Sequence, residues 1–66
     1  MNIDEKLKHA LAPMAGQRAG QSFMNNLYLL EPRAYDMLLN TPLDPFYEDG
    51  KLWAAVQHIK DNFVED

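Results

Sequence analysis

Few side chains in this 66-residue chain could act as nucleophiles, since it has one serine and no cysteine. Nucleophilic catalysis needs an activated Ser, Cys, Thr or Lys beside a base. Ser22 stands in the sequence Gly-Gln-Ser-Phe-Met, which lacks the second glycine of a nucleophile elbow. We also expect Ser22 to lie within a helix instead of a strand-to-helix turn. The sequence therefore predicts a protein that is not an enzyme and that has no cofactor.

Oxygen and nitrogen ligands for a metal ion are present, but their spacing is unfavourable. Asp44, Glu48 and Asp49 do not follow the alternating acidic pattern of a calcium-binding loop. His9 and His58 stand in different predicted helices, and neither has a neighbouring His or Cys. We expect both histidines to be ordinary residues of helix surfaces, and we predict no metal site.

The size of the chain limits how much core it can form. A domain of 66 residues buries only about 60% of the surface of its unfolded chain. Without cysteine, disulfides cannot support such a core, so a partner subunit or partner protein is the expected support. Hydrophobic residues make up 47% of the sequence and include one tryptophan and six other aromatic residues, which argues against disorder. We predict one domain over residues 1–66.

Hydrophobic residues recur with helical spacing, and no segment alternates with period two over enough residues to form a sheet. Asn2 or Asp4 can cap a first helix, and Asn40 can end the third helix in the left-handed conformation. The sequence thus predicts an all-α fold, a small bundle of three principal helices plus a short N-terminal helix. The predicted helices cover residues 4–11, 14–30 and 32–39, and a last one begins at residue 51 with the core stripe Leu52, Val56, Ile59 and Phe63.

The predicted helix over residues 14–30 carries a stripe that steps by four, three, four and three residues. Two glycines inside a helix cost about 1 kcal/mol each relative to alanine, so a close neighbour would explain them. An antiparallel second copy would set the glycines opposite leucines and form a two-fold homodimer. Two alternatives are that the helix begins nearer Arg18, or that the stripe packs against another helix of the same chain. The predicted self-association residues are Gly16, Gly20, Phe23, Leu27 and Leu30.

The opposite side of this helix is polar and consists of Arg18, Gln21, Asn25 and Tyr28. This polar stripe could be a solvated face, as every amphipathic helix has one. Alternatively, it could hold the acidic loop Leu-Asp-Pro-Phe-Tyr-Glu-Asp-Gly of residues 43–50. Arg18 would then pair in bidentate fashion with one of the three carboxylates in that loop. Within the loop, we expect Phe46 to be buried and the acidic side chains to face water.

Charge is distributed unevenly along the chain. Residues 1–30 carry two acidic and three basic side chains, a net charge of +1, whereas residues 31–66 carry eight acidic and three basic ones, a net charge of −5. An acidic half disfavours nucleic-acid binding, which depends on neutralising phosphates. It favours a basic protein partner. Trp53 lies about 100° from Leu52 around the last helix, so its ring either covers the core or anchors an interface. The predicted partner-binding residues are Trp53, Asp44, Tyr47, Glu48 and Asp49.

Two short motifs, Arg-x-Gly-Gln at residues 18–21 and Asp-Pro-Phe-Tyr-x-Asp at residues 44–49, resemble small uncharacterised phage and prophage proteins. The resemblance covers residues 18–63 and implies an origin, without a mechanism or site residues. We therefore expect a non-enzymatic protein-binding module, a phage-encoded inhibitor or accessory factor. The alternative is a structural or assembly component of a phage particle. The charged start and the absence of a long apolar segment predict a cytoplasmic protein that does not contact membranes.

Overall fold

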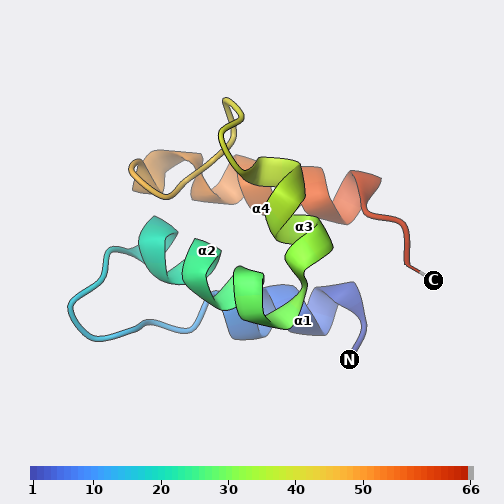
Figure 1. Ribbon diagram of the computed structural model, residues 1–66, viewed down its shortest axis with the longest axis horizontal. Helices are drawn as coiled ribbons and strands as arrows, with labels where there is room; N and C mark the ends of the chain where they lie inside the picture. Colours follow the sequence, from blue (N-terminus) through green and yellow to red (C-terminus); the bar gives the residue numbers. More distant parts are fainter. Residues whose placement is uncertain (66) are drawn as a thin grey trace.

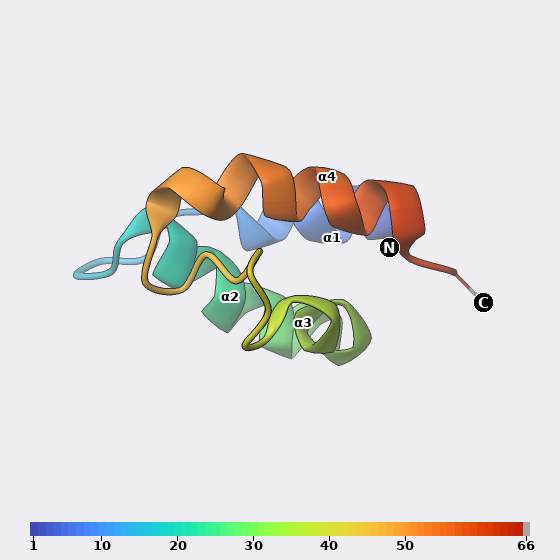
Figure 2. The ribbon, with the colours of Figure 1, turned by 90° about the horizontal axis from the view of Figure 1, so that it is seen from above.

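The computed structural model describes residues 1–65, so Asp66, the last residue of the predicted domain, lies outside the described residues. Within the described part, the helices form two layers: α1 and α4 lie side by side in one, and α2 and α3 form the other (Figures 1 and 2). No strand occurs in residues 1–65, which confirms the predicted all-α bundle. The elements are α1 (Ile3–Ala10), α2 (Ala19–Leu30), α3 (Pro32–Leu38), the 3-10 helix η1 (Asp49–Lys51) and α4 (Leu52–Asn62).

Two asparagines mark the ends of helices as the sequence predicts, one before α1 and one after α3. The Asn2 side chain accepts a hydrogen bond from the Glu5 backbone nitrogen at 2.9 Å, and the Glu5 side chain accepts one from the Asn2 nitrogen at 3.5 Å. This reciprocal capping box identifies Asn2, not Asp4, as the cap of α1. Asn40 has a φ of 59°, which confirms the predicted left-handed residue after α3.

The predicted start of the second helix at residue 14 is wrong, because α2 begins at Ala19. Asn26 holds the preceding loop by donating hydrogen bonds to the carbonyl oxygens of Ala10 at 3.2 Å and Ala12 at 3.1 Å. Gly16 lies in this loop with a φ of +77°, a left-handed conformation that glycine adopts without steric cost. The alternative that the helix begins nearer Arg18 is therefore the observed one.

The core lies between the two layers and receives residues from all four α-helices. In α4, Val56 and Ile59 are buried, and Leu52 and Phe63 pack against the core from its edge, as the predicted stripe requires. Full burial of such side chains contributes about 1.5–3 kcal/mol each, so a few residues account for much of the stability of this chain. The buried hydrophobic residues are Ile3, Leu7, Ala10, Phe23, Met24, Leu27, Ala34, Leu38, Ala55, Val56 and Ile59.

The stripe predicted for self-association packs inside the chain instead. Phe23 and Leu27 have no exposed surface, Gly20 is buried, and Leu30 packs against the core. Gly16 does not belong to the stripe, since it lies outside α2. These positions correct the assignment of Gly16, Gly20, Phe23, Leu27 and Leu30 to a surface for a second copy. Packing within the chain was the alternative, and the homodimer itself stays a prediction.

Ionic contacts join α1 to the junction of α2 and α3. Glu31 is 7% exposed, and its Oε1 accepts a hydrogen bond from Lys6 Nζ at 2.8 Å. Its Oε2 lies 3.3 Å from Arg33 Nε, and the Arg33 guanidinium lies 5.0 Å from the centre of the Phe63 ring. The hydrogen bond from Lys6 lowers the pKa of Glu31 below its ordinary value of 4.5, against the opposing effect of burial. The lowered pKa means that the fold stabilises the charged form of Glu31.

This contact predicts a pH dependence of the free energy of unfolding. The stabilisation is present above the unfolded-state pKa of 4.5 and is lost as the pH falls through the lower folded-state value. Glu31→Gln should lower the free energy of unfolding at neutral pH by about 1 kcal/mol and make its decline below pH ~4.5 shallower. Urea titrations at several pH values measure both effects. Asp61→Asn, which removes an exposed carboxylate, is the control, and equal slopes for both variants would contradict the prediction.

Candidate protein-binding surface

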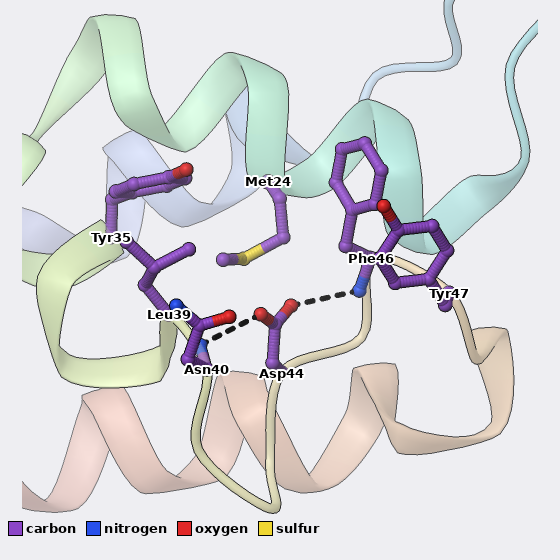
Figure 3. Close-up of a pocket in the computed structure, with 7 residues that line it drawn as sticks. All are labelled: Met24, Tyr35, Leu39, Asn40, Asp44, Phe46 and Tyr47. Atoms are coloured by element: carbon purple, nitrogen blue, oxygen red, sulfur yellow. Dashed lines mark hydrogen bonds between the residues drawn. The ribbon is translucent and has the colours of Figure 1, made fainter.

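The segment that connects α3 to η1 has no regular structure, and short polar side chains fix its path. Asp44 Oδ2 accepts a hydrogen bond from the Asn40 backbone nitrogen, and Asp44 Oδ1 accepts one from the Phe46 nitrogen, each at 3.0 Å (Figure 3). The Thr41 hydroxyl donates to the Leu38 carbonyl oxygen at 2.7 Å. Such local side-chain bonds replace the missing backbone pairing of a turn. The carboxylate of Asp44 therefore has a structural role in this loop.

The same loop docks on the N-terminal end of α2. Pro45 is buried, and its carbonyl oxygen lies so close to Gly20 that a Cβ at residue 20 would overlap it. Asp49 Oδ1 accepts a hydrogen bond from the Gly20 nitrogen at 3.0 Å. The acidic side chain thus binds one of the unpaired N–H groups in the first turn, where the helix dipole also favours negative charge. The close neighbour expected for Gly20 is this loop.

Arg18 contacts the loop, but not in the predicted way. Its Nη2 donates a hydrogen bond to the Phe46 carbonyl oxygen at 2.8 Å, and its Nη1 lies 3.8 Å from Asp49 Oδ1. The predicted bidentate pair with a carboxylate is wrong, because the guanidinium forms its short bond with the backbone. Both side chains of the ion pair are about half exposed, so water screens their attraction. Arg18 therefore holds the loop mainly through Phe46.

A pocket of about 200 Å³ lies between α2, the end of α3 and the loop (Figure 3). Met24 lies between Tyr35 on one side and Phe46 and Tyr47 on the other. Its volume is smaller than the roughly 300–1,000 Å³ of typical small-molecule sites, so it suits a single side chain. The pocket is lined by Met24, Tyr35, Leu39, Asn40, Asp44, Phe46 and Tyr47.

Two of the five predicted partner-binding residues line the pocket, and three do not. Asp44 and Tyr47 come together at the pocket, where Tyr47 is 82% exposed. Trp53 lies in the first turn of α4, 69% exposed and outside the pocket lining, so its ring does not cover the core. Asp49 caps α2, and Glu48 Oε1 lies 3.7 Å from Lys51 Nζ. Of the five predicted residues, only Asp44 and Tyr47 therefore belong to the pocket lining.

Apart from Asp44 and Tyr47, the residues of the pocket lining were not predicted from the sequence as contact residues. Tyr35 and Leu39 are four residues apart, a spacing that places them on the same side of a helix. Met24 comes from α2, and its burial alone would assign it to the core. No local pattern shows that these residues meet the loop around Asp44, because that contact depends on how α3 and the loop fold back over α2.

The serine and the two histidines considered for catalysis and metal binding all lie on helices. The buried Ser22 hydroxyl accepts a hydrogen bond from the Met14 nitrogen at 3.3 Å and so holds the loop before α2. His9 is exposed, and His58 Nδ1 lies 3.3 Å from Asn62 Nδ2 on the same helix. Within residues 1–65, no three His, Asp or Glu residues are grouped as metal ligands. In that same part of the chain, every helix is too short or too polar to cross a membrane.

The contact between Gly20 and the loop predicts that alanine destabilises the protein more at residue 20 than at residue 50. Gly20→Ala should lower the free energy of unfolding by about 1–3 kcal/mol, because the added Cβ forces the Pro45 carbonyl away. Gly50→Ala is the matched control, since a Cβ there has no neighbour within 4 Å. Urea titration measures the stability, and light scattering measures the mass. A stable Gly20→Ala variant whose mass falls from dimer to monomer would contradict packing within the chain.

No protein-family model, curated protein or solved structure matches the chain. The resemblance of its two short motifs to phage proteins therefore stays a prediction.

Proposed function

We propose that this chain is a non-enzymatic protein-binding module that uses the surface of its acidic half. The observation that carries the proposal is the exposure of two large aromatic side chains, Tyr47 at 82% and Trp53 at 69%. Aromatic residues at interfaces often provide much of the binding energy because they bury a large area. In a chain whose small core leaves both rings outside, a partner that covers them would gain that energy.

Charge supports a basic partner. Residues 31–66 have a net charge of −5, and Asp36, Glu48 and Asp61 are exposed on α3, the loop and α4. Complementary charges increase the rate of association and select partners more than they add affinity. The aromatic rings would therefore provide affinity, and the acidic side chains would favour basic surfaces over acidic ones, nucleic acids included.

The narrower version of the proposal is a phage-encoded inhibitor or accessory factor that acts on a host or phage protein in the host cytoplasm. It rests on the resemblance of the motifs at residues 18–21 and 44–49. A structural or assembly component is the second candidate. It is favoured by exposed apolar side chains on other elements, Leu29 at 77% on α2 and Val64 at 76% after α4, because an assembly subunit is contacted on several sides. The same side chains could serve a homodimer.

The exposure of Trp53 leads to a test of the proposal. Trp53→Ala should weaken binding to a partner captured from a host lysate by about 30-fold, as removal of an anchor costs about 2 kcal/mol or more. Because the ring lies outside the core, the melting temperature should change little. Leu29→Ala, which removes an exposed side chain of the other layer, is the control. Full binding by Trp53→Ala, or its unfolding, would contradict the proposed surface.

A further inference from the structure

We propose that the pocket between α2, α3 and the loop binds a long basic side chain, arginine or lysine, of the partner. This inference rests on the proposed function, and it names the chemistry of the contact. Most of the lining is apolar or aromatic, and one carboxylate, that of Asp44, stands within it. Arginine and lysine combine an apolar stem with a charged end, so they match both parts of this lining.

The carboxylate decides between a basic and a purely apolar occupant. Each oxygen of Asp44 accepts one backbone hydrogen bond, from Asn40 or from Phe46. A carboxylate has about four acceptor positions, so both oxygens can accept a further bond. An apolar side chain in the pocket would remove water from these oxygens without replacing its hydrogen bonds, which is costly. A guanidinium or ammonium group would instead form charge-assisted hydrogen bonds with them.

The surroundings of Asp44 also favour a cation. The lining includes the rings of Tyr35, Phe46 and Tyr47, and a cation close to aromatic faces is attracted by their electron density. No basic side chain belongs to the lining, all of which lies within the described residues, so Asp44 has no cation of its own there. Arg18 is bonded to the carbonyl oxygen of Phe46 and does not line the pocket.

Flexible parts of the lining would adapt to the stem of the occupant. Met24 is a buried residue of the lining, and its unbranched thioether can adjust to the shape of a neighbour. Leu39 belongs to the lining and is 40% exposed, so a stem that covers it gains apolar contact without disturbing the core. The volume of about 200 Å³ admits one such side chain, not a cofactor.

Capped tripeptides test the inference on the full chain labelled with nitrogen-15. Ac-Ala-Arg-Ala-NH2 should shift the amide resonances of Asn40, Asp44 and Phe46 in a saturable manner. The citrulline tripeptide has nearly the same shape without the charge, and it should bind about tenfold more weakly. Added salt should weaken only the arginine tripeptide. A third tripeptide carries leucine in place of arginine. The inference would be overturned if the citrulline tripeptide bound as tightly as the arginine tripeptide, if the leucine tripeptide bound more tightly, or if the resonance shifts were confined to the surroundings of Trp53.

Two variants with the same loss of charge separate the pocket from the general acidity of the chain. Asp44→Asn should reduce binding of the arginine tripeptide by at least about tenfold, whereas Glu48→Gln, outside the lining, should change it by less than about twofold. Asp44 also supports the loop, so Tyr47→Ala is the second variant. Its ring is 82% exposed, and it should weaken binding several-fold at an unchanged melting temperature. Equal effects of Asp44→Asn and Glu48→Gln, or unchanged binding by Tyr47→Ala, would overturn the inference.

Failure of the pocket inference can be distinguished from failure of the proposed protein-binding function. If the arginine tripeptide does not bind while Trp53→Ala still weakens binding to the partner, the pocket inference fails and the protein-binding function stands. If neither Trp53→Ala nor Tyr47→Ala weakens binding to the partner, the proposed function fails even if the arginine tripeptide binds.

Discussion

The close contact between Gly20 and the loop that follows α3 holds that loop against the start of α2. Only a residue without a side chain lets the Pro45 carbonyl approach α2 so closely. The same approach brings the Asp49 carboxylate to the Gly20 nitrogen and the Phe46 carbonyl to Arg18. Each hydrogen bond contributes about 1 kcal/mol, a noticeable share of the 5–15 kcal/mol that stabilises a typical domain. Because the loop has no regular structure, these contacts set the position of its aromatic residues and one wall of the pocket.

Polar contacts also fasten the opposite end of the bundle. Glu31, at the end of α2, binds Lys6 of α1, and the side chain of Glu65 accepts a hydrogen bond from the Ile3 nitrogen at 2.6 Å. Both chain ends lie on this side of the molecule (Figure 1). A core this small leaves loops and ends with few apolar contacts, so hydrogen bonds and ion pairs join segments that the core does not hold. Water weakens exposed ion pairs, so the burial of Glu31 matters more for stability than the number of ion pairs.

Local patterns predicted the helices and the buried stripe of α4. The spacing of Val56 and Ile59 placed them on one buried face of α4, and the left-handed Asn40 followed from its side-chain chemistry. The start of α2 differs from the predicted one because Gly16 continues the spacing of the helix by chance, while its backbone is left-handed. Gly20 was rightly expected to have a close neighbour, but the sequence does not show that this neighbour is a loop carbonyl.

The candidate site could be predicted only in part, for a related reason. The exposure of Tyr47 and Trp53 depends on which segments pass nearby, and helical angles placed Trp53 only on the flank of the core stripe. The pocket combines α2, α3 and the loop, so its lining follows from tertiary packing. Asp44 was predicted as a contact for a partner, and the structure gives it a local role as well, because it caps the backbone at Asn40 and Phe46.

Hydrogen exchange at the Gly20 amide tests the central contact most directly. In an isolated helix this amide belongs to the first turn and has no partner, so it exchanges rapidly with solvent. We predict that it exchanges slowly here, because it is bonded to Asp49 beneath the loop. Asp49→Ala should accelerate its exchange about tenfold and leave the Leu27 amide unchanged. Rapid exchange of the Gly20 amide in the unaltered protein, or the same rate in Asp49→Ala, would show that Asp49 does not protect this amide.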